Sequence, residues 1–375
     1  MTLSAIKKMG ALVSGLVLTG MTSSAVAVQP WNMPEGVTEV SHVIYDLHSL
    51  VFWICVVICI GVFAVMFYSI FAHRKSKGHK AAQFHESTLV EVIWTTVPFV
   101  ILIFIAVPAT KALIKIDDVG NADMTLKITG YQWKWQYDYL EDGISYYSNL
   151  KTPRAQIYGQ EDKGENYLLE VDNEVVLPIN KKIRFLITAS DVIHAWWIPD
   201  LAVKQDAIPG FVNEAWTRIE KPGVYRGQCA ELCGRDHGFM PIVVRAVEQE
   251  EYDKWVAEKK QVAQAEAASV DQQWSKNDLM AKGEEIYNKT CASCHQANGE
   301  GLAGMFPALK GSEVATGDAH DHLNVVINGR SGTSMAAFGP QLSDVQLASV
   351  VTYQRNAWGN DTGDIIQPTT IKALR

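Results

Sequence analysis

Five consecutive residues near the C-terminus carry the clearest chemistry in the sequence: Cys291-Ala292-Ser293-Cys294-His295. Two thiols separated by two residues can add to the vinyl groups of a haem, and the histidine that follows can supply the proximal ligand of its iron. A zinc site or a disulfide would use the cysteines but would leave His295 without a role. The motif therefore predicts a covalently attached haem c.

The sixth ligand of that haem iron should be a methionine or a histidine further along the chain. Met335 follows a loop rich in glycine and serine and precedes the last strongly predicted helix. Thioether ligation by Met335 would raise the reduction potential of the haem. The competing residues are Met305, His320 and His322. We expect Met305 to be a packing residue and the two histidines to lie at the surface.

A second cluster of metal-binding residue types lies within a segment of twelve residues: Cys229, Cys233, His237 and Met240. Two thiolates, an imidazole and a thioether favour a soft metal, copper above all. With two cysteines, two copper ions could share bridging thiolates, and such a site would need a second histidine, for which His194 is the candidate. A disulfide would give Met240 no role, and a thioether is unusual at zinc, so these two alternatives are weaker.

The residues before position 115 predict a membrane anchor. Residues 1–27 have the pattern of a signal peptide, because two lysines precede a short apolar run and Ala25-Val26-Ala27 offers a small-residue cleavage site. A first membrane anchor is the alternative for this segment. Residues 49–72 and 92–110 contain no Asp, Glu, Lys or Arg, and Glu91 lies at the edge of the second segment. Each segment can cross a hydrocarbon core of about 30 Å.

The loop between the two apolar segments sets the expected orientation. Residues 73–80 include four Lys or Arg residues, and short loops rich in these residues stay in the cytoplasm. We therefore predict a transmembrane hairpin over residues 28–115 with the N-terminus and the C-terminal domains on the periplasmic side of a bacterial inner membrane. A pair of helices buried in a globular domain is the alternative, and the basic loop argues against it.

Residues 116–247 predict a periplasmic β-domain. Every second residue from Tyr131 to Tyr139 is aromatic, which is typical of one strand with an aromatic face. Apolar residues alternate in the same way over residues 124–128 and 183–187, and turn-forming clusters separate these runs. The pattern favours an antiparallel β-sandwich.

The C-terminal third reads as a linker followed by a small helical domain. Residues 248–274 are rich in Ala, Gln and Glu, which predicts an exposed helical linker rather than part of a core. Residues 275–358 predict an all-α domain around the haem motif, and residues 359–375 a tail. The net charge of −8 argues against a nucleic-acid partner, because phosphate binding needs a basic face.

These motifs together resemble subunit II of haem–copper cytochrome c oxidases, in the form that has a cytochrome c domain fused at its C-terminus. The resemblance rests on four features in the order of that family: the two-span hairpin, the aromatic run at 131–139, the copper cluster at 229–240 and the haem motif. It covers nearly the whole mature chain. It implies a cupredoxin-like sandwich with a dinuclear copper centre, CuA, followed by a class I cytochrome c domain.

The resemblance also implies roles for individual residues. The implied CuA ligands are His194, Cys229, the backbone carbonyl of Glu231, Cys233, His237 and Met240. The Glu231 side chain would reach a magnesium ion shared with subunit I. Trp133 matches the residue at which electrons reach CuA from cytochrome c, although a donor on the same chain could use another route and leave Trp133 partly structural. Glu91 matches a glutamate near the mouth of a proton path into subunit I, with a carboxylate that anchors the subunit interface as the alternative.

The implied function is electron transfer into a proton-pumping oxidase. A cytochrome c donor would reduce the haem c, and electrons would pass to CuA and then to haem a in subunit I, which also holds CuB; subunit III and membrane lipid are the other implied partners. Two other classes of protein remain open: a reductase of the denitrifying type, and a copper-delivery protein that needs no haem.

Overall fold

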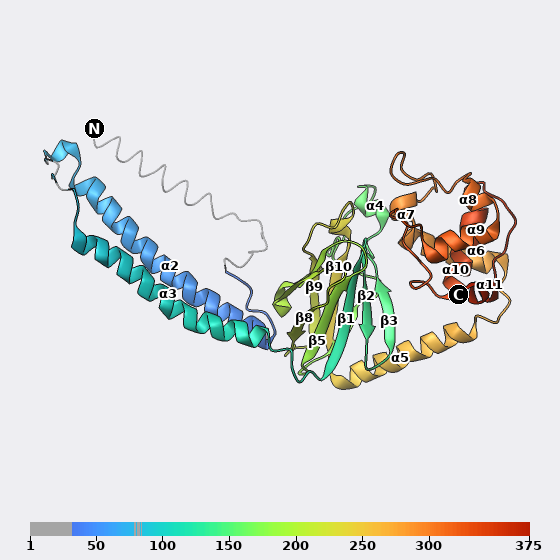
Figure 1. Ribbon diagram of the computed structural model, residues 1–375, viewed down its shortest axis with the longest axis horizontal. Helices are drawn as coiled ribbons and strands as arrows, with labels where there is room; N and C mark the ends of the chain where they lie inside the picture. Colours follow the sequence, from blue (N-terminus) through green and yellow to red (C-terminus); the bar gives the residue numbers. More distant parts are fainter. Residues whose placement is uncertain (1–31, 79, 81–82, 84) are drawn as a thin grey trace, which may run out of the picture. The chain divides into compact units, whose positions relative to one another are not determined.

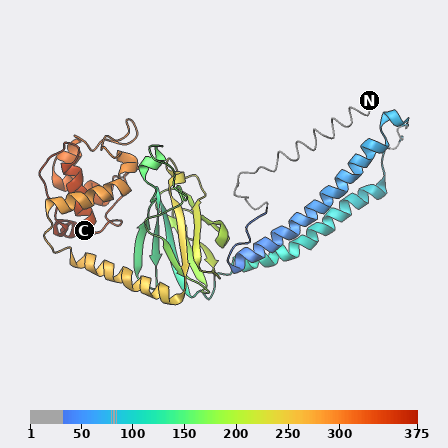
Figure 2. The same ribbon diagram turned by 180° about the vertical axis from the view of Figure 1, so that it is seen from behind.

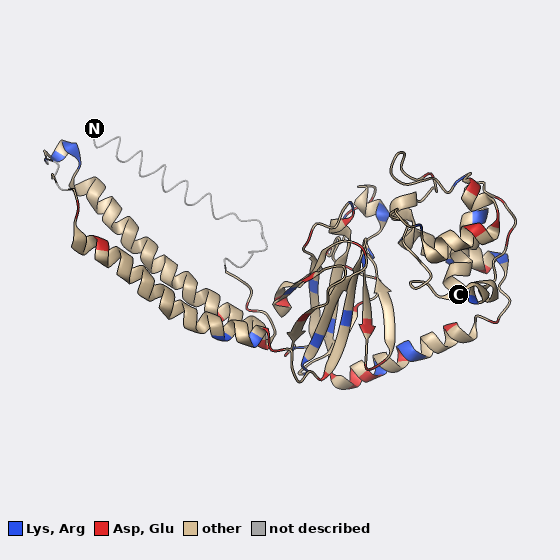
Figure 3. Ribbon diagram, viewed as in Figure 1, with Lys and Arg blue, Asp and Glu red and all other residues tan. Residues whose placement is uncertain are grey.

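The computed structural model describes residues 32–78, 80, 83 and 85–375, so the predicted signal peptide lies outside the described residues. The first elements are two long helices, α2 (Glu39–Ala72) and α3 (Thr88–Ile116), joined through the short 3-10 helix η1 (Lys75–Lys77). Both are long and apolar enough to cross a membrane. Charged side chains are almost absent between their ends (Figure 3), as predicted for two spans.

The two ends of this hairpin that are remote from the basic loop both contact the β-domain. Glu39 at the start of α2 forms ion pairs with Lys115 at the end of α3 and with Arg218 of the sandwich. The Trp216 indole donates a hydrogen bond to the Lys115 carbonyl at 3.1 Å. The helix ends and the sandwich therefore lie on the same side of any membrane that the hairpin crosses.

The β-domain is a sandwich of two five-stranded sheets, in the orders β3-β2-β1-β5-β8 and β4-β10-β9-β6-β7 (Figures 1 and 2). The strands are β1 (Met124–Tyr131), β2 (Lys134–Tyr139), β3 (Ile144–Ser148), β4 (Val175–Pro178), β5 (Ile183–Ala189), β6 (His194–Ile198), β7 (Val203–Ala207), β8 (Asn213–Thr217), β9 (Gly223–Cys229) and β10 (Pro241–Val247). Short helices α4 (Arg154–Ile157), η2 (Pro199–Leu201) and η3 (His237–Phe239) lie in the connections. We call residues 124–247 the copper domain, after the cluster predicted in it.

Strand pairing departs from the prediction in one respect. Most neighbours are antiparallel, but β1 pairs with β5, and β4 with β10, in parallel, so the sandwich is mixed. The predicted alternation holds within strands. In β5, residues Ile183, Phe185 and Ile187 are fully buried and face the interior, while the residues between them are partly exposed.

The aromatic run is not one strand, and that prediction was wrong. Strand β1 ends at Tyr131 and β2 begins at Lys134, and these two residues pair across a tight hairpin. Gln132 and Trp133 form the turn. Hydrogen bonds from outside the hairpin hold it, because Asp191 accepts from the Gln132 backbone N–H at 2.7 Å. Period-two spacing continues through a two-residue turn, so the pattern alone does not reveal the reversal.

The predicted linker is helical but is not only a spacer. Helix α5 (Gln249–Ala268) buries Tyr252 and Trp255 in the sandwich core, where Trp255 packs against Tyr139 with ring centroids 5.0 Å apart. The rest of α5 is mostly exposed, as in Val262. At its far end, Glu266 accepts a hydrogen bond from the Ser343 hydroxyl at 2.6 Å. The helix thus contacts both of the domains that it connects.

The C-terminal region is all-α, as predicted, with helices α6 (Lys276–Thr290), α7 (Ala292–His295), α8 (Glu313–Thr316), α9 (Ala319–Asn328), α10 (Asp344–Asn356) and α11 (Pro368–Leu374). Helices α6 and α10 cross closely at Gly283, where a Cβ atom would lie 2.2 Å from the Ser349 carbonyl oxygen. A capping box formed by Ser343 and Gln346 starts α10.

The last residues are not a free tail, and the domain boundary predicted at 358 was wrong. Ile366 and Ile371 are buried in the same core as α6, α9 and α10. Arg375 donates hydrogen bonds to the carbonyls of Gly339 and Leu342. The final helix therefore completes the domain, and we call residues 275–375 the helical domain. Among the described residues of this segment, Ile366, Pro368 and Ile371 are the buried apolar ones, too few to show a helical period.

Candidate copper and haem centres

The structure brings the sulfur and nitrogen donors of the copper cluster together in one buried place. The Cys229 Sγ lies 3.9 Å from the Cys233 Sγ and 3.9 Å from the His194 Nδ1. The Cys233 Sγ is 3.5 Å from the His237 Nδ1 and 3.5 Å from the Met240 Sδ. Each cysteine thus has one histidine beside it, and the two sulfurs lie between the two imidazoles.

Strand pairing positions two of these donors. His194 begins β6, Cys229 ends β9, and the pairing of Trp196 with Cys229 sets the register between them. Gly130 in β1 leaves the space that the imidazole needs, since a Cβ atom there would lie 2.8 Å from the His194 ring. The loop from Ala230 to Met240 then returns the chain to β10 and carries the remaining donors.

Neighbouring side chains orient the site. Asp191 lies 2.9 Å from the His194 Nε2, which leaves Nδ1 facing the sulfurs. Burial opposes protonation of His194, but hydrogen bonds with Asp191 and Cys229 outweigh it and raise its pKa. The Gln132 amide and the Trp133 indole both donate to the Cys233 carbonyl, at 2.8 and 3.1 Å. The hairpin turn is therefore joined directly to the copper loop.

The chemistry of this donor set fits copper. The hydrogen bond with Cys233 lowers the pKa of the Cys229 thiol in spite of its burial, and a thiolate is the form that binds metals. The two cysteines are free, and a disulfide would need its sulfurs about 2 Å apart. Two thiolates, two imidazoles and a buried thioether match soft copper better than they match zinc.

Glu231 offers its backbone rather than its side chain to the cluster. Its carbonyl oxygen is 3.4 Å from the Cys229 Sγ, so this oxygen stands at the edge of the site. Its side chain is exposed, where a ligand from outside the chain could reach it. The neighbouring Leu232 is also exposed, at 77%.

The haem motif has the geometry of a proximal ligand site. Cys291 ends α6, and Cys294 and His295 lie on the one-turn helix α7. The His295 Nδ1 donates to the Pro307 carbonyl at 2.9 Å, so the other ring nitrogen is left for the iron. Burial lowers the pKa of His295, which favours the neutral imidazole that binds metals. These residues fit a haem c.

The residues weighed as the sixth ligand differ in their surroundings. Met335 lies in the loop between α9 and α10, where its carbonyl accepts from the Arg330 N–H at 2.9 Å. Met305 is 63% exposed and is not the expected packing residue. His320 is exposed as expected, but His322 is only 2% exposed, so the prediction that it lies at the surface was wrong. Its position on the inner face of α9, beside Leu323 and Val326, explains the burial.

Trp133 and Glu91 lie in very different places. Trp133 is at the hairpin turn, hydrogen-bonded to the copper loop. Glu91 lies in the first turn of α3, far along the chain from the copper cluster, and is exposed among the described residues. Sequence reasoning missed Asp191 and Gly130 as parts of the site. Asp191 precedes His194 by three residues, a spacing that could have suggested the contact.

A buried two-thiolate site in a β-sandwich, a membrane hairpin and a haem-type helical domain define a membrane-anchored electron-transfer protein. Family comparison agrees with this class. Residues 27–112 match the transmembrane domain, and residues 124–247 the periplasmic domain, of cytochrome c oxidase subunit II. Residues 278–353 match a family described as cytochrome c oxidase, cbb3-type, subunit III.

Individual relatives point the same way. A protein of Rickettsia bellii named "Probable cytochrome c oxidase subunit 2" is 39% identical over 252 residues, which is 66% of this chain and 92% of the relative. Cytochrome c oxidase subunit 2 of Cyanidium caldarium is 38% identical over 62% of this chain and 92% of its own length. A crystal structure of the periplasmic domain of subunit II from Bradyrhizobium japonicum is 46% identical over 38% of this chain and 97% of that domain, with a TM-score of 0.34.

The chain belongs to the cytochrome c oxidase subunit II family, and it carries a cytochrome c domain at its C-terminus. It is therefore part of a haem–copper terminal oxidase, an oxidoreductase complex. The family implies copper, and the C-terminal domain implies haem.

Proposed function

We propose that this chain is the subunit through which a proton-pumping oxidase receives its electrons. A reduced periplasmic cytochrome c delivers electrons to the helical domain, the helical domain passes them to the copper domain, and the copper domain passes them to haem a in subunit I. Oxygen is reduced to water in subunit I. The observation that carries this proposal is the convergence of both cysteines with His194, His237 and Met240 in one buried cluster.

Each residue of the cluster has a distinct task in this proposal. Cys229 and Cys233 would hold copper through their thiolates, His194 and His237 through their imidazoles, and Met240 and the Glu231 carbonyl would complete the donor set. When bound, a thiolate-bridged pair of copper ions shares one electron, so that little has to move during transfer. Asp191 and the hairpin turn hold these side chains in place, which keeps the reorganisation small.

In the helical domain, Cys291 and Cys294 would hold the haem c covalently, and His295 and Met335 would bind its iron. Pro307 fixes the orientation of the His295 ring. Trp133 lies where the copper loop can be reached from outside the sandwich, and it provides the contact through which electrons arrive. Supporting this, its indole is hydrogen-bonded to the backbone of a copper-ligand cysteine.

The proposed partners follow from the two ends of the molecule. The hairpin lies in the bacterial inner membrane against subunit I, which holds haem a and CuB, and near subunit III, with both soluble domains on the periplasmic side. Exposed Leu232 and Glu231 face subunit I, where the Glu231 carboxylate reaches a shared magnesium ion. Glu91 lies near the opening of a proton path on the opposite side of the membrane.

Oxygen uptake by the purified oxidase complex tests the electron route. With reduced cytochrome c as donor, the double variant Cys291→Ala/Cys294→Ala should lose at least about tenfold in turnover, since electrons then lack their acceptor. A small artificial reductant that reaches the copper domain directly should restore most of the rate. Unchanged turnover with cytochrome c would contradict the proposal, because it would mean that the donor reaches the copper domain without the helical domain.

A second assay separates the oxidase from a reductase of the denitrifying type. The same preparation should consume oxygen and not nitric oxide when supplied with reduced cytochrome c. Consumption of nitric oxide at a comparable rate would move the chain to the other class.

A further inference from the structure

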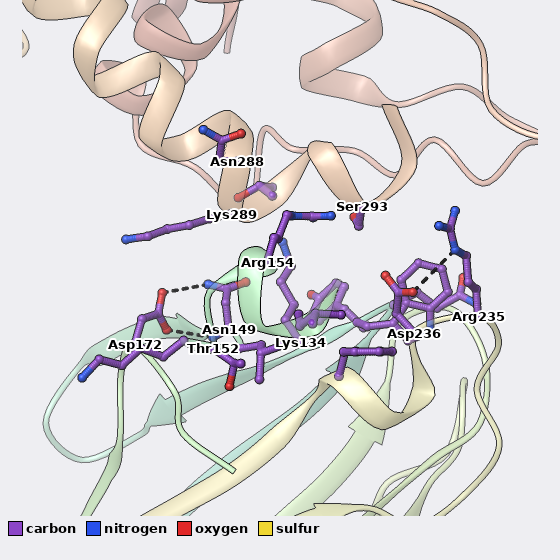
Figure 4. A pocket seen from close by; sticks show the side chains of 18 of the residues that line it. Lys134, Asn149, Thr152, Arg154, Asp172, Arg235, Asp236, Asn288, Lys289 and Ser293 are labelled. Atoms are coloured by element: carbon purple, nitrogen blue, oxygen red, sulfur yellow. Dashed lines mark hydrogen bonds and ion pairs between the residues drawn. The ribbon is translucent and has the colours of Figure 1, made fainter. Parts of the chain in front are cut away.

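A pocket of about 670 Å3 is lined by residues of both soluble domains (Figure 4). Its copper-domain wall includes the β1–β2 turn and α4. Its helical-domain wall includes the end of α6, Ser293 between the two haem cysteines, and Phe338 in the loop before α10. The pocket therefore lies where the two redox domains meet.

The charges around this pocket do not balance. Five Lys or Arg side chains line it, against three Asp side chains. Asp236 forms an ion pair with Arg235. Asp172 and Asp191 accept hydrogen bonds from the neutral groups of Asn149 and Gln132, and their charges favour the charged form of Lys134 without an ion pair to it. Lys289 is paired with Glu285 outside the pocket. Lys134, Lys151 and Arg154 remain without an ion pair among the described residues, against the two carboxylates of Asp172 and Asp191, so the pocket keeps an excess of one positive charge.

Lys134 is the least expected of these cations, because its side chain is only 8% exposed. Its ammonium lies 4.7 Å from the centre of the Tyr147 ring and 5.4 Å from the centre of the Phe338 ring, which belong to different domains. These contacts leave its N–H donors unused, since no described residue accepts a hydrogen bond from them. A buried ammonium is costly unless it is paired and hydrogen-bonded.

Burial lowers the pKa of Lys134 to about 8. The side chain is thus still mostly charged at neutral pH, and a partner of opposite charge would stabilise it. Asn288 and Ser293 offer neutral hydrogen-bonding groups from the helical domain, while no carboxylate lines that wall.

Arg154 enters the pocket from α4 and points towards the helical-domain side in Figure 4. A guanidinium binds planar or tetrahedral oxyanions through two parallel N–H groups, and an ammonium adds a point charge. Donors that come from several directions suit a ligand with several oxygen atoms better than they suit a chloride ion.

We propose that this pocket is a binding site for a free tetrahedral oxyanion of the phosphate class, held by Lys134 and Arg154. Bound there, the anion offsets the positive charge between the domains and accepts hydrogen bonds from both walls. It holds the helical domain against the β1–β2 turn, next to Trp133. The site lies outside the copper and haem ligand sets. Binding of the anion there would regulate electron transfer from the helical domain to the copper domain, which rests on the proposed function.

Binding can be measured without any electron-transfer assay. The full chain, loaded with copper and haem and purified in detergent, is dialysed against radiolabelled inorganic phosphate in a chloride buffer. One saturable site per chain is expected, with competition by sulfate and none by added chloride at matched ionic strength. Lys134→Met and Arg154→Gln should each weaken phosphate binding by about tenfold or more, which corresponds to losing one charge-assisted hydrogen bond.

The matched control is Lys127→Met, which removes a lysine of the neighbouring strand β1 that is paired with Asp138 and does not line the pocket. This variant should bind phosphate as the unchanged chain does. Lys134→Met replaces a buried charge by an apolar chain of similar length, and Arg154 lies on a surface helix, so at least one variant should keep the fold. Absence of saturable binding, or equal binding in all variants, would overturn the proposal.

A second readout tests the link between the domains. Hydrogen exchange at residues 288–293 and 132–134 should slow by about threefold or more when phosphate is added, and the effect should disappear in Lys134→Met. Phosphate binding with no change in exchange would refute the claim that the anion holds the domains together. Neither readout depends on electron flow, so failure of the proposed function would leave both outcomes interpretable.

Discussion

The copper site and the haem site of this chain are built in different ways. The copper donors come from strands and one short loop, and each lies 3.5 to 3.9 Å from the sulfur of Cys229 or Cys233. In the haem domain, His295 is held by Pro307, but long segments around it, residues 296–312 and 329–343, contain no helix or strand. Strands therefore frame the copper donors, while irregular chain surrounds the proximal histidine, and we expect a bound haem to fill the centre of the helical domain.

This difference follows from the two cores. The sandwich core combines both sheets with Tyr252 and Trp255 of α5. The helical core is smaller and, among the described residues, receives only Leu309, Phe338 and Leu342 from the long loops, all three partly buried. A small domain with so much irregular chain needs an additional source of burial. A bound haem would supply this burial. Because the unfolded chain cannot hold the haem, the free energy of binding would contribute to folding.

The largest expected effect is on the helical domain without its haem. In Cys291→Ala/Cys294→Ala, amide protection in α6 and α10 should fall by about a hundredfold or more, because the loops lose their packing partner. In the unchanged chain, removal of copper by a chelator should alter protection in β6 and β9 by only a few fold. Hydrogen exchange with mass spectrometry measures both. Equal losses in the two domains would remove the contrast between them.

A second prediction tests whether α5 belongs to the sandwich. Trp255→Ala should lower the free energy of unfolding of the copper domain by about 3 kcal/mol, as expected for loss of a buried aromatic side chain. Val262→Ala, on the exposed part of the same helix, should change it by less than about 0.5 kcal/mol. Urea unfolding followed by far-ultraviolet circular dichroism gives both values. If both substitutions change the free energy of unfolding by a similarly small amount, α5 is only a spacer.

The rigid frame around His194 can be tested by steric means. In Gly130→Ala the new Cβ would lie 2.8 Å from the imidazole, so the ring or β1 must shift, at a cost of about 2 kcal/mol. Copper content should fall or the copper absorption spectrum should change. Gly238→Ala, in the copper loop with open space around it, is the control and should keep a native spectrum. A native copper spectrum in both variants would show that β1 or the His194 ring can shift without disturbing the site, which would contradict a rigid frame.

The smallest prediction concerns pH and the helical domain. Burial lowers the pKa of His322 to about 4, whereas the unfolded chain would bind a proton near pH 6.5. As pH falls from about 6.5 towards 4, the unfolded chain binds a proton at this histidine and the folded domain does not, so the free energy of unfolding falls. The expected loss from this residue between pH 7 and pH 5 is about 1.5 to 2 kcal/mol. Above pH 7 the effect vanishes, because the histidine is neutral in both states.

Guanidinium unfolding of the helical domain at pH 7 and pH 5 measures this loss. His322→Gln should remove most of it, while His320→Gln, two residues away and exposed, should leave it unchanged. If both variants retain the full loss, another group carries the pH dependence.

The membrane hairpin, the order of the domains and the types of metal-binding residue could all be predicted from local sequence. A long uncharged segment predicts a membrane span, and closely spaced cysteines predict a metal or haem site, without information from distant residues. Three features could not be predicted in this way. The turn at Gln132-Trp133 depends on Asp191 and on the Cys233 carbonyl, both far away in the sequence. The burial of Trp255 depends on Tyr139, and that of Ile371 depends on helices before it.

The candidate site shows the same division. The donors can be identified in the sequence by their residue types. The residues that position the donors cannot be identified in this way. Gly130 and Asp191 are ordinary residues until strand register places them beside His194. The polar residues around His322 favour a surface position in the sequence. The structure shows that His322 is buried, because it lies on the inward face of α9.

Electron paramagnetic resonance of the oxidised full chain, purified from membranes and combined with copper and haem analysis, tests the central claim most directly. The account predicts two copper ions that share one unpaired electron, together with one covalently bound haem c per chain. A signal from a single isolated copper ion would contradict the joint assignment of Cys229, Cys233, His194, His237 and Met240, and would favour a protein that delivers copper.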